Sequence, residues 1–213
     1  MERLQAEIPK VGTVAREDAF EVFRNRICNI LVGFGLQELN TFNITSKDAL
    51  NTKMNVELEC VELANALTVD YGVLRSWVLP SLMQVVGENT HHEYPQNVFT
   101  TGTVFRKDAK SETGVREDVR LAVGLCKGNA NFTDVKQIVD EVGHALNVQF
   151  NIREAAHGSF IEGRVGRVSV QGKDVAYVGE MHPAVLEAWK VEMPVAAFEL
   201  NLSELFAVLK VKN

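Results

Sequence analysis

The stretch from Tyr177 to Leu205, YVGEMHPAVLEAWKVEMPVAAFELNLSEL, decides the fold of this chain. Its pattern predicts a strand, a short helix opened by Pro183 and a second strand over Val195–Leu200, which is a near-continuous apolar run. That second strand nevertheless carries Glu199 and is followed directly by Asn201. A carboxylate at the end of a buried strand either forms an ion pair in the core or lines a cleft. The sequence alone leaves both interpretations open.

Outward from this stretch, the chain alternates between amphipathic helices and strands that pair. Glu17–Phe34 predicts the clearest helix, because its apolar residues recur at spacings of three and four. Asn97–Arg106 and Arg120–Lys127 bracket a charged connection and predict an antiparallel hairpin with a long loop. The fold class is therefore α+β, an antiparallel β-sheet flanked by helices. Further strands are expected at Leu36–Thr45, Val56–Leu63, Val148–Ile152, Arg164–Val170 and Val175–Gly179, and further helices at Ser46–Lys53, Leu79–Glu88 and Asn131–Leu146.

The composition is that of an ordinary globular protein. The 213 residues are 46% hydrophobic and 23% charged, and the net charge of −6 argues against a protein that coats nucleic-acid phosphates. Three widely spaced cysteines indicate a reducing compartment, and no apolar run could span a bilayer, so we expect a cytoplasmic protein without a membrane partner. We expect residues 1–13 to form a linker or arm and residues 14–213 to form one domain.

The usual catalytic and metal motifs are missing from the sequence. His91, His92 and Glu93 suggest a metal, but adjacent side chains point in different directions and no third ligand follows at a diagnostic spacing. No GxSxG, HExxH or phosphate-cradling glycine pattern occurs either. We therefore expect no metal site, and the sequence does not indicate a self-contained hydrolase or P-loop enzyme.

Three arginines are better candidates for a binding site. Arg75, Arg106 and Arg120 lie at predicted strand ends or beside the charged hairpin loop. A guanidinium in such a place can bind a carboxylate or phosphate through two hydrogen bonds. It can equally pair with nearby acidic residues such as Asp118. The sequence does not decide between these two roles.

Two long segments, VELANALTVDYGVLRSWVLPSLMQVVGENTHHEYPQNVF (61–99) and GEMHPAVLEAWKVEMPVAAFELNLSEL (179–205), carry a resemblance. They resemble the C-terminal, class II synthetase-like domain of phenylalanyl-tRNA synthetase β subunits of the archaeal–eukaryotic type. The resemblance covers roughly residues 14–208. Known members carry further domains upstream, so the chain is expected to be a fragment of a longer β subunit or a short stand-alone relative.

The resemblance implies the class II aminoacyl-tRNA synthetase fold with its three motifs. Glu17–Thr45 matches the helix and strand of the first motif, although Phe42 stands where a proline is usual. TGTVFRKD matches the first strand of the second motif and places Arg106 where an arginine binds the ATP α-phosphate. The third motif is degenerate: its glycine is replaced by Glu199, and its γ-phosphate arginine by Glu204, with Asn201 between them. A carboxylate near a triphosphate site opposes binding, so no catalytic residues are expected.

The resemblance therefore implies a non-catalytic domain that supports assembly of the complex that ligates phenylalanine to tRNA(Phe). The expected partner is the catalytic α subunit, in a heterotetramer that uses ATP and Mg²⁺, while this domain itself holds no cofactor. Two alternatives remain open: a stand-alone regulator that binds an amino acid or adenylate through the three arginines, and a still-active class II ligase. Candidate residues for the α-subunit interface lie on the first helix: Phe20, Phe23, Arg24, Ile27, Ile30 and Leu31.

Overall fold

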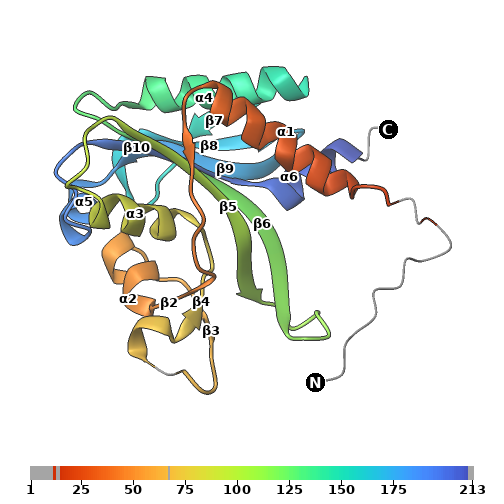
Figure 1. The fold of residues 1–213 in the computed structure, drawn as a ribbon, viewed down its shortest axis with the longest axis horizontal. Coiled ribbons are helices and arrows are strands. Elements are labelled where there is room, and N and C mark those ends of the chain that lie inside the picture. The colour runs from red at the N-terminus through yellow and green to blue at the C-terminus, as the bar shows by residue number, and fades with distance from the viewer. Residues whose placement is uncertain (1–11, 13–14, 67, 211–213) are drawn as a thin grey trace, which may run out of the picture.

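The computed structural model describes residues 12, 15–66 and 68–210, and a seven-stranded sheet forms its centre (Figure 1). The strands of this sheet are β1 (Gln37–Glu38), β5 (Gln96–Lys107), β6 (Val115–Cys126), β7 (Asn151–Glu154), β8 (Phe160–Val170), β9 (Lys173–Met181) and β10 (Val195–Asn201). They follow the spatial order β1-β5-β6-β10-β9-β8-β7. Only the short β1 runs parallel to its neighbour, and every other pairing is antiparallel. The predicted α+β class, an antiparallel sheet flanked by helices, is confirmed.

Helices cover both faces of the large sheet (Figure 1). One face carries α1 (Ala19–Gly33), α4 (Phe132–Leu146) and α6 (Leu202–Lys210). The other face carries α2 (Lys47–Leu50), α3 (Leu79–Glu88) and α5 (Pro183–Ala188). A small antiparallel sheet of order β2-β4-β3 lies beside α2, and it consists of β2 (Ile44–Thr45), β3 (Val61–Glu62) and β4 (Val73–Leu74). Two 3-10 helices complete this region, η1 (Thr52–Met54) and η2 (Val69–Tyr71).

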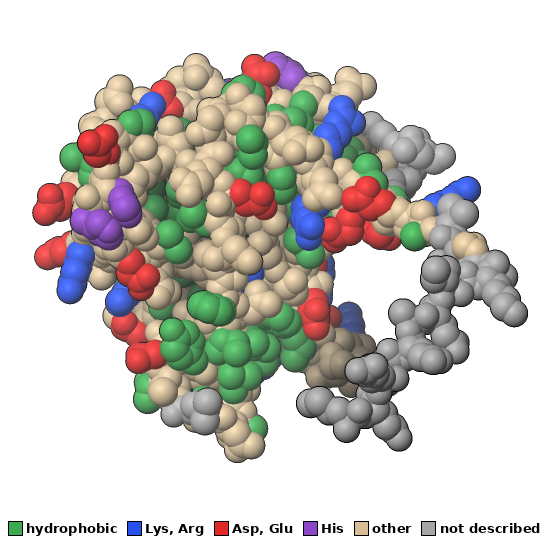
Figure 2. All heavy atoms as spheres, in the orientation of Figure 1, with side chains coloured by type: hydrophobic (Ala, Val, Ile, Leu, Met, Phe, Trp, Pro, Cys, Tyr) green, Lys and Arg blue, Asp and Glu red, His purple; other side chains and the backbone are tan. Residues whose placement is uncertain are grey.

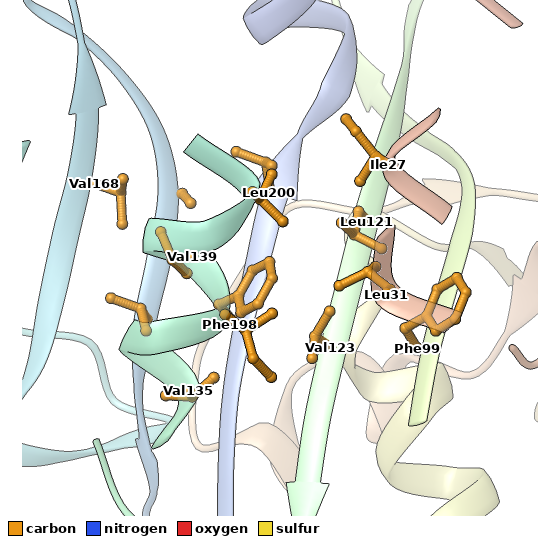
Figure 3. Packing of buried hydrophobic residues seen from close by; sticks show 14 of the residues in the cluster. Ile27, Leu31, Phe99, Leu121, Val123, Val135, Val139, Val168, Phe198 and Leu200 are labelled. Carbon is orange, nitrogen blue, oxygen red and sulfur yellow. The ribbon is translucent and has the colours of Figure 1, made fainter. Parts of the chain in front are cut away.

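Strand β10 lies between the two hydrophobic cores that cover the faces of the large sheet. It pairs with β6 on one side and β9 on the other, and all of its residues are buried. Because side chains alternate across a strand, Phe198 and Leu200 enter the core under α1 and α4, whereas Val195 and Ala197 enter the core under α3. Figure 3 shows the first core, where Phe198 lies beside α4. The same alternation places Glu199 on the α3 face.

The long predicted helices begin and end where the sequence indicates. Asp18 accepts a hydrogen bond from the main-chain N–H of Phe20 and so caps α1, and Gly35 follows that helix with a φ of 77°. Asn131 caps α4 in the same way by accepting from the N–H of Asp134. Helix α3 has the bounds predicted from its apolar spacing.

Two of the predicted strands are wrong. Leu36–Thr45 forms two short strands in different sheets, β1 paired with β5 and β2 paired with β4, because the chain crosses from one sheet to the other between them. Of Val56–Leu63, only the two residues of β3 pair with another strand. The main-chain N–H and C=O of Leu58 instead bond to the side chain of Asn51, which takes the place of a neighbouring strand. Leu58 itself is exposed.

Other element bounds differ by a few residues. The loop of the β5–β6 hairpin spans only residues 108–114, because residues 115–119, although rich in charge, still pair with β5. Strand β7 begins three residues later than the predicted Val148. The predicted linker at residues 1–13 lies, apart from Gly12, outside the described residues.

Arg75 fastens the small sheet to the large one. The side chain is 1% exposed, and its Nε donates to the carbonyl oxygen of Thr103 at 2.9 Å. Its Nη1 donates to Thr41 Oγ1 at 2.8 Å and to the carbonyl oxygen of Phe42 at 3.2 Å. A Cβ added to Gly102 would lie 1.8 Å from Arg75 Nη2. Only glycine at this position of β5 lets the guanidinium lie against the strand.

We expect Gly102→Ala to lower the free energy of unfolding by about 1–3 kcal/mol, the usual cost of overpacking a filled site. Gly128→Ala is the matched control, because a Cβ at Gly128 meets nothing within 4 Å. Urea unfolding of both variants measures the difference. Equal unfolding midpoints would show that Arg75 can move away from β5 without cost.

Candidate functional site

A cavity of about 610 Å³ opens on the α3 face of the large sheet, and we call it the cleft. The ends of β5 and β6 form one wall, β8, β9 and β10 form the floor, and residues near the start of α3 close the other side. This volume is in the range of small-molecule sites. The cleft brings together the predicted residues Arg106, Arg120, Glu199, Asn201 and Glu204.

Glu199 is held by three hydrogen bonds. One carboxylate oxygen accepts from the main-chain N–H groups of Val78 at 2.9 Å and Leu79 at 2.8 Å. The other oxygen accepts from Arg120 Nη1 at 2.9 Å, and both side chains of this ion pair are largely buried. The N–H groups belong to the first turn of α3, which has no capping side chain of its own. Both interpretations of this carboxylate hold, since Glu199 is paired and also lines the cleft.

Glu204 binds two cations at the mouth of the cleft. Its carboxylate contacts Arg116 Nη2 at 2.5 Å and also contacts Lys173 Nζ. Burial opposes the charged form of Glu204, but hydrogen bonds from Lys173 and Arg116 outweigh it and lower the pKa of this carboxyl below its usual value. Asn201 fixes the start of α6 by accepting from the N–H of Glu204 at 3.0 Å.

The three predicted arginines have different surroundings. Arg120 is paired with Glu199, yet its Nε is buried and has no hydrogen-bond partner among the described residues. Arg106 is more than a third exposed, and no hydrogen bond or ion pair joins its side chain to any described residue. Partial desolvation and the nearby charge of Arg120 lower the pKa of Arg106. Arg75 does not line the cleft, because its guanidinium lies in the contact between the two sheets described above.

Sequence reasoning missed a group of aromatic rings that also lines the cleft. His157 is the middle of this ring cluster, with ring centroids 4.8 Å from Tyr177, 5.6 Å from Trp77 and 5.4 Å from Phe160. The guanidinium of Arg167 lies 4.0 Å from the Tyr177 ring centroid. Burial lowers the pKa of His157 and so favours its neutral form. These rings come from segments far apart in the chain, so no local sequence pattern predicts that they lie together.

Most of the interface candidates on α1 contribute to the domain's own core. Ile27 and Leu31 are fully buried within this chain, so they pack against the sheet (Figure 3). Phe20, Phe23 and Ile30 are partly buried against the same core. Arg24 is about one-third exposed and pairs with Glu21 at 2.6 Å. The role of this helix at a subunit interface stays a prediction.

The paired histidines do not form a metal site in the described structure. His91 and His92 have ring centroids 4.2 Å apart, and both residues are exposed, as is Glu93. Within residues 12, 15–66 and 68–210, no group of three or more His, Cys, Asp or Glu residues could hold a metal ion.

The antiparallel sheet with its flanking helices and open cleft defines a class II aminoacyl-tRNA synthetase-like domain. A solved pyrrolysyl-tRNA synthetase from Desulfitobacterium hafniense shares this fold, with a TM-score of 0.73 over 90% of this chain and 69% of that one, at 16% identity. The chain belongs to the phenylalanyl tRNA synthetase beta chain CLM domain family, whose model matches residues 4–202.

Archaeal relatives agree with this assignment. The chain is 45% identical over 204 residues to the phenylalanine–tRNA ligase beta subunit of Pyrococcus abyssi, which covers 95% of this chain and 37% of that protein. It is 32% identical over 207 residues to the same subunit of Methanopyrus kandleri, covering 96% of this chain and 35% of the relative. The chain thus spans about a third of the length of the curated relatives that it matches.

We expect Glu199→Gln to lower the free energy of unfolding by about 2–4 kcal/mol, because it leaves the largely buried Arg120 without its counter-charge. Glu162→Gln serves as the control, since Glu162 is an exposed carboxylate on β8. The two variants are compared by chemical denaturation. If both unfold at the same denaturant concentration as the parent chain, the Glu199 carboxylate does not stabilise the start of α3.

Proposed function

We propose that this domain is a non-catalytic part of a phenylalanine–tRNA ligase beta subunit and supports assembly with the catalytic α subunit. The family assignment and the fold support the first part of this proposal. The ion pairs of the cleft support a non-catalytic role, and exposed apolar side chains near the small sheet support the assembly role. The complex, rather than this domain, would bind ATP and Mg²⁺, and tRNA(Phe) would be bound through the complex.

The observation that carries the proposal is the pairing of charges in the cleft. Apart from Arg106, the cations in and beside the cleft are already bound to carboxylates of this chain: Arg120 to Glu199, Arg167 to Asp174, and Arg116 and Lys173 to Glu204. Opening these pairs would leave buried charges uncompensated, and the carboxylates themselves would repel the phosphates. The cleft is therefore a poor site for ATP, in agreement with the degenerate third motif.

An exposed group of apolar side chains supports an assembly role. Phe42, Ile44, Val69 and Tyr71 are 81%, 39%, 89% and 51% exposed, and we call them the apolar patch. Figure 2 shows hydrophobic side chains gathered over the region of the small sheet. Contiguous exposed apolar surface commonly marks a site of protein association. A heterotetramer with the α subunit would cover this patch.

The location of the protein remains part of the proposal. No helix within the described residues is both long and apolar enough to cross a bilayer. Burial raises the pKa values of the Cys28 and Cys126 thiols to about 11, and all three cysteines are free. Buried free thiols fit the reducing cytoplasm in which we propose that the complex works.

We expect this chain alone to give no ATP–pyrophosphate exchange with phenylalanine, because the cleft cations other than Arg106 are already paired and three carboxylates line the cleft. The positive control is a complete α–β phenylalanine–tRNA ligase in the same assay. Exchange above the level of a heat-denatured sample would favour the alternative of a still-active ligase.

We expect Phe42→Ser and Arg24→Glu each to weaken association with the α subunit by about tenfold, which corresponds to ~1.4 kcal/mol. Phe42→Ser removes apolar area from the patch, and Arg24→Glu reverses a partly exposed charge on α1. Lys136→Glu is the matched control, because Lys136 forms a comparable ion pair with Asp140 on α4.

Co-purification and analytical ultracentrifugation of α with each variant measure this effect. Unchanged association of Phe42→Ser would remove the patch from the interface, and unchanged association of Arg24→Glu would remove α1. If Lys136→Glu weakened association equally, the effect would reflect net charge rather than a defined interface.

A further inference from the structure

The charges that line the cleft do not cancel. Four cations, Arg106, Arg120, Arg167 and Lys173, face three carboxylates. Each carboxylate is paired: Glu199 with Arg120, Glu204 with Lys173, and Asp174 with Arg167. Glu204 and Asp174 also bind Arg116 and Arg153, which do not line the cleft. Among the lining residues, Arg106 is therefore the cation without a carboxylate partner, and the cleft carries a small positive excess.

Two unused hydrogen-bond donors line the same cleft. The side chain of Arg106 has no hydrogen bond or ion pair to any described residue, so its guanidinium is available. The buried Nε of Arg120 also lacks a partner among these residues. An unsatisfied buried donor costs about 1–3 kcal/mol, and an acceptor from a bound ligand would remove this cost. Antiparallel pairing of β5 with β6 puts both arginines on the same face of the sheet.

Aromatic rings line another part of the cleft. The ring cluster of Trp77, His157, Phe160 and Tyr177 gives a wall against which a planar group can pack. The guanidinium of Arg167 lies over one of these rings, 4.0 Å from the Tyr177 centroid, and is itself paired with Asp174. Burial lowers the pKa of His157 and favours its neutral form. A ligand that fills the cleft thus meets both unused arginine donors and aromatic rings.

We propose that the cleft binds a small, ring-bearing organic anion of low charge, with its acidic group on Arg106 and Arg120 and its ring against the ring cluster. The group on the arginines is a carboxylate or a phosphate, since both accept two hydrogen bonds from a guanidinium. A polyphosphate is disfavoured, because Arg106 is the one lining cation without a carboxylate partner among the described residues and three carboxylates line the same cleft. A cationic group on the ligand also has no free carboxylate to meet in the cleft. This site is independent of the assembly role.

The test is a titration of the full chain followed by NMR of its two tryptophan indole N–H groups. Trp77 lines the cleft, whereas Trp189 does not, so the second indole is an internal control. The probes are 3-phenylpropionate for a carboxylate, phenyl phosphate for a phosphate, 3-phenylpropanamide as the uncharged match and ATP as the polyanion. We expect one of the two anions, at concentrations up to about 10 mM, to shift the Trp77 signal, with no shift from the amide or ATP.

Arg106→Gln should weaken this binding by about tenfold or more, because it removes charge-assisted hydrogen bonds. The variant should unfold at the same temperature as the parent chain, since Arg106 contacts no described residue through a hydrogen bond or ion pair. Lys110→Gln removes one positive charge from the exposed loop of the same hairpin and should leave binding unchanged.

Each outcome decides the proposal. Binding of either anion that is lost in Arg106→Gln and kept in Lys110→Gln supports it, and the better anion identifies the acidic group. No Trp77 shift with either anion overturns it, as does binding that survives Arg106→Gln or that is lost equally in Lys110→Gln. Tighter binding of ATP than of both small anions overturns the assignment to an anion of low charge.

Discussion

The bonds of the Glu199 carboxylate hold the centre of this domain together. One oxygen accepts hydrogen bonds from two N–H groups at the start of α3, and the other accepts one from Arg120. A single side chain therefore joins β10, β6 and a helix. An acid is stable among buried apolar residues only when its oxygens are satisfied in this way. The position of α3, and with it one side of the cleft, depends on this one group. A glycine there, as in the third motif of catalytic class II domains, would leave the helix start without its acceptor.

The same interaction connects the architecture with the proposed non-catalytic role. The Glu199 carboxylate caps α3 and neutralises Arg120. It therefore fills space in the cleft and binds a cation that a nucleotide would need. Glu204 acts in parallel at the mouth of the cleft by binding Arg116 and Lys173. The domain has thus kept the class II fold and used its cleft residues for internal ion pairs. Fold and activity are separable in this way because the sheet depends on its two cores and the chemistry depends on a few polar residues.

The sequence predicted those parts of the structure that depend on local periodicity. The apolar spacing of α3, the caps of α4 and the apolar run of β10 each carry their own signal over consecutive residues. The helix at Ser46–Lys53 was predicted, but the strands expected on either side of it, at 36–45 and 56–63, were wrong, because side chains such as Asn51 and Arg75 satisfy main-chain groups there in place of long ladders. The family resemblance predicted a degenerate third motif with Glu199 and Glu204, and the structure adds the partners of these two carboxylates. The ring cluster could not be predicted, because only tertiary folding brings its rings together.

The attachment of the small sheet has a consequence for motion in the folded state. Strands β2, β3 and β4 are two residues each, so few ladder hydrogen bonds hold this sheet together. Arg75 supplies two of its hydrogen bonds to the large sheet, from its Nε to the carbonyl oxygen of Thr103 and from the N–H of Phe105 to its own carbonyl oxygen. Regions with few such bonds open at lower free energy than the rest of a protein, as separate cooperative units. Amide hydrogens of residues 41–75 would therefore exchange with solvent through local opening, while those of β6 and β10 would exchange only when the whole domain unfolds.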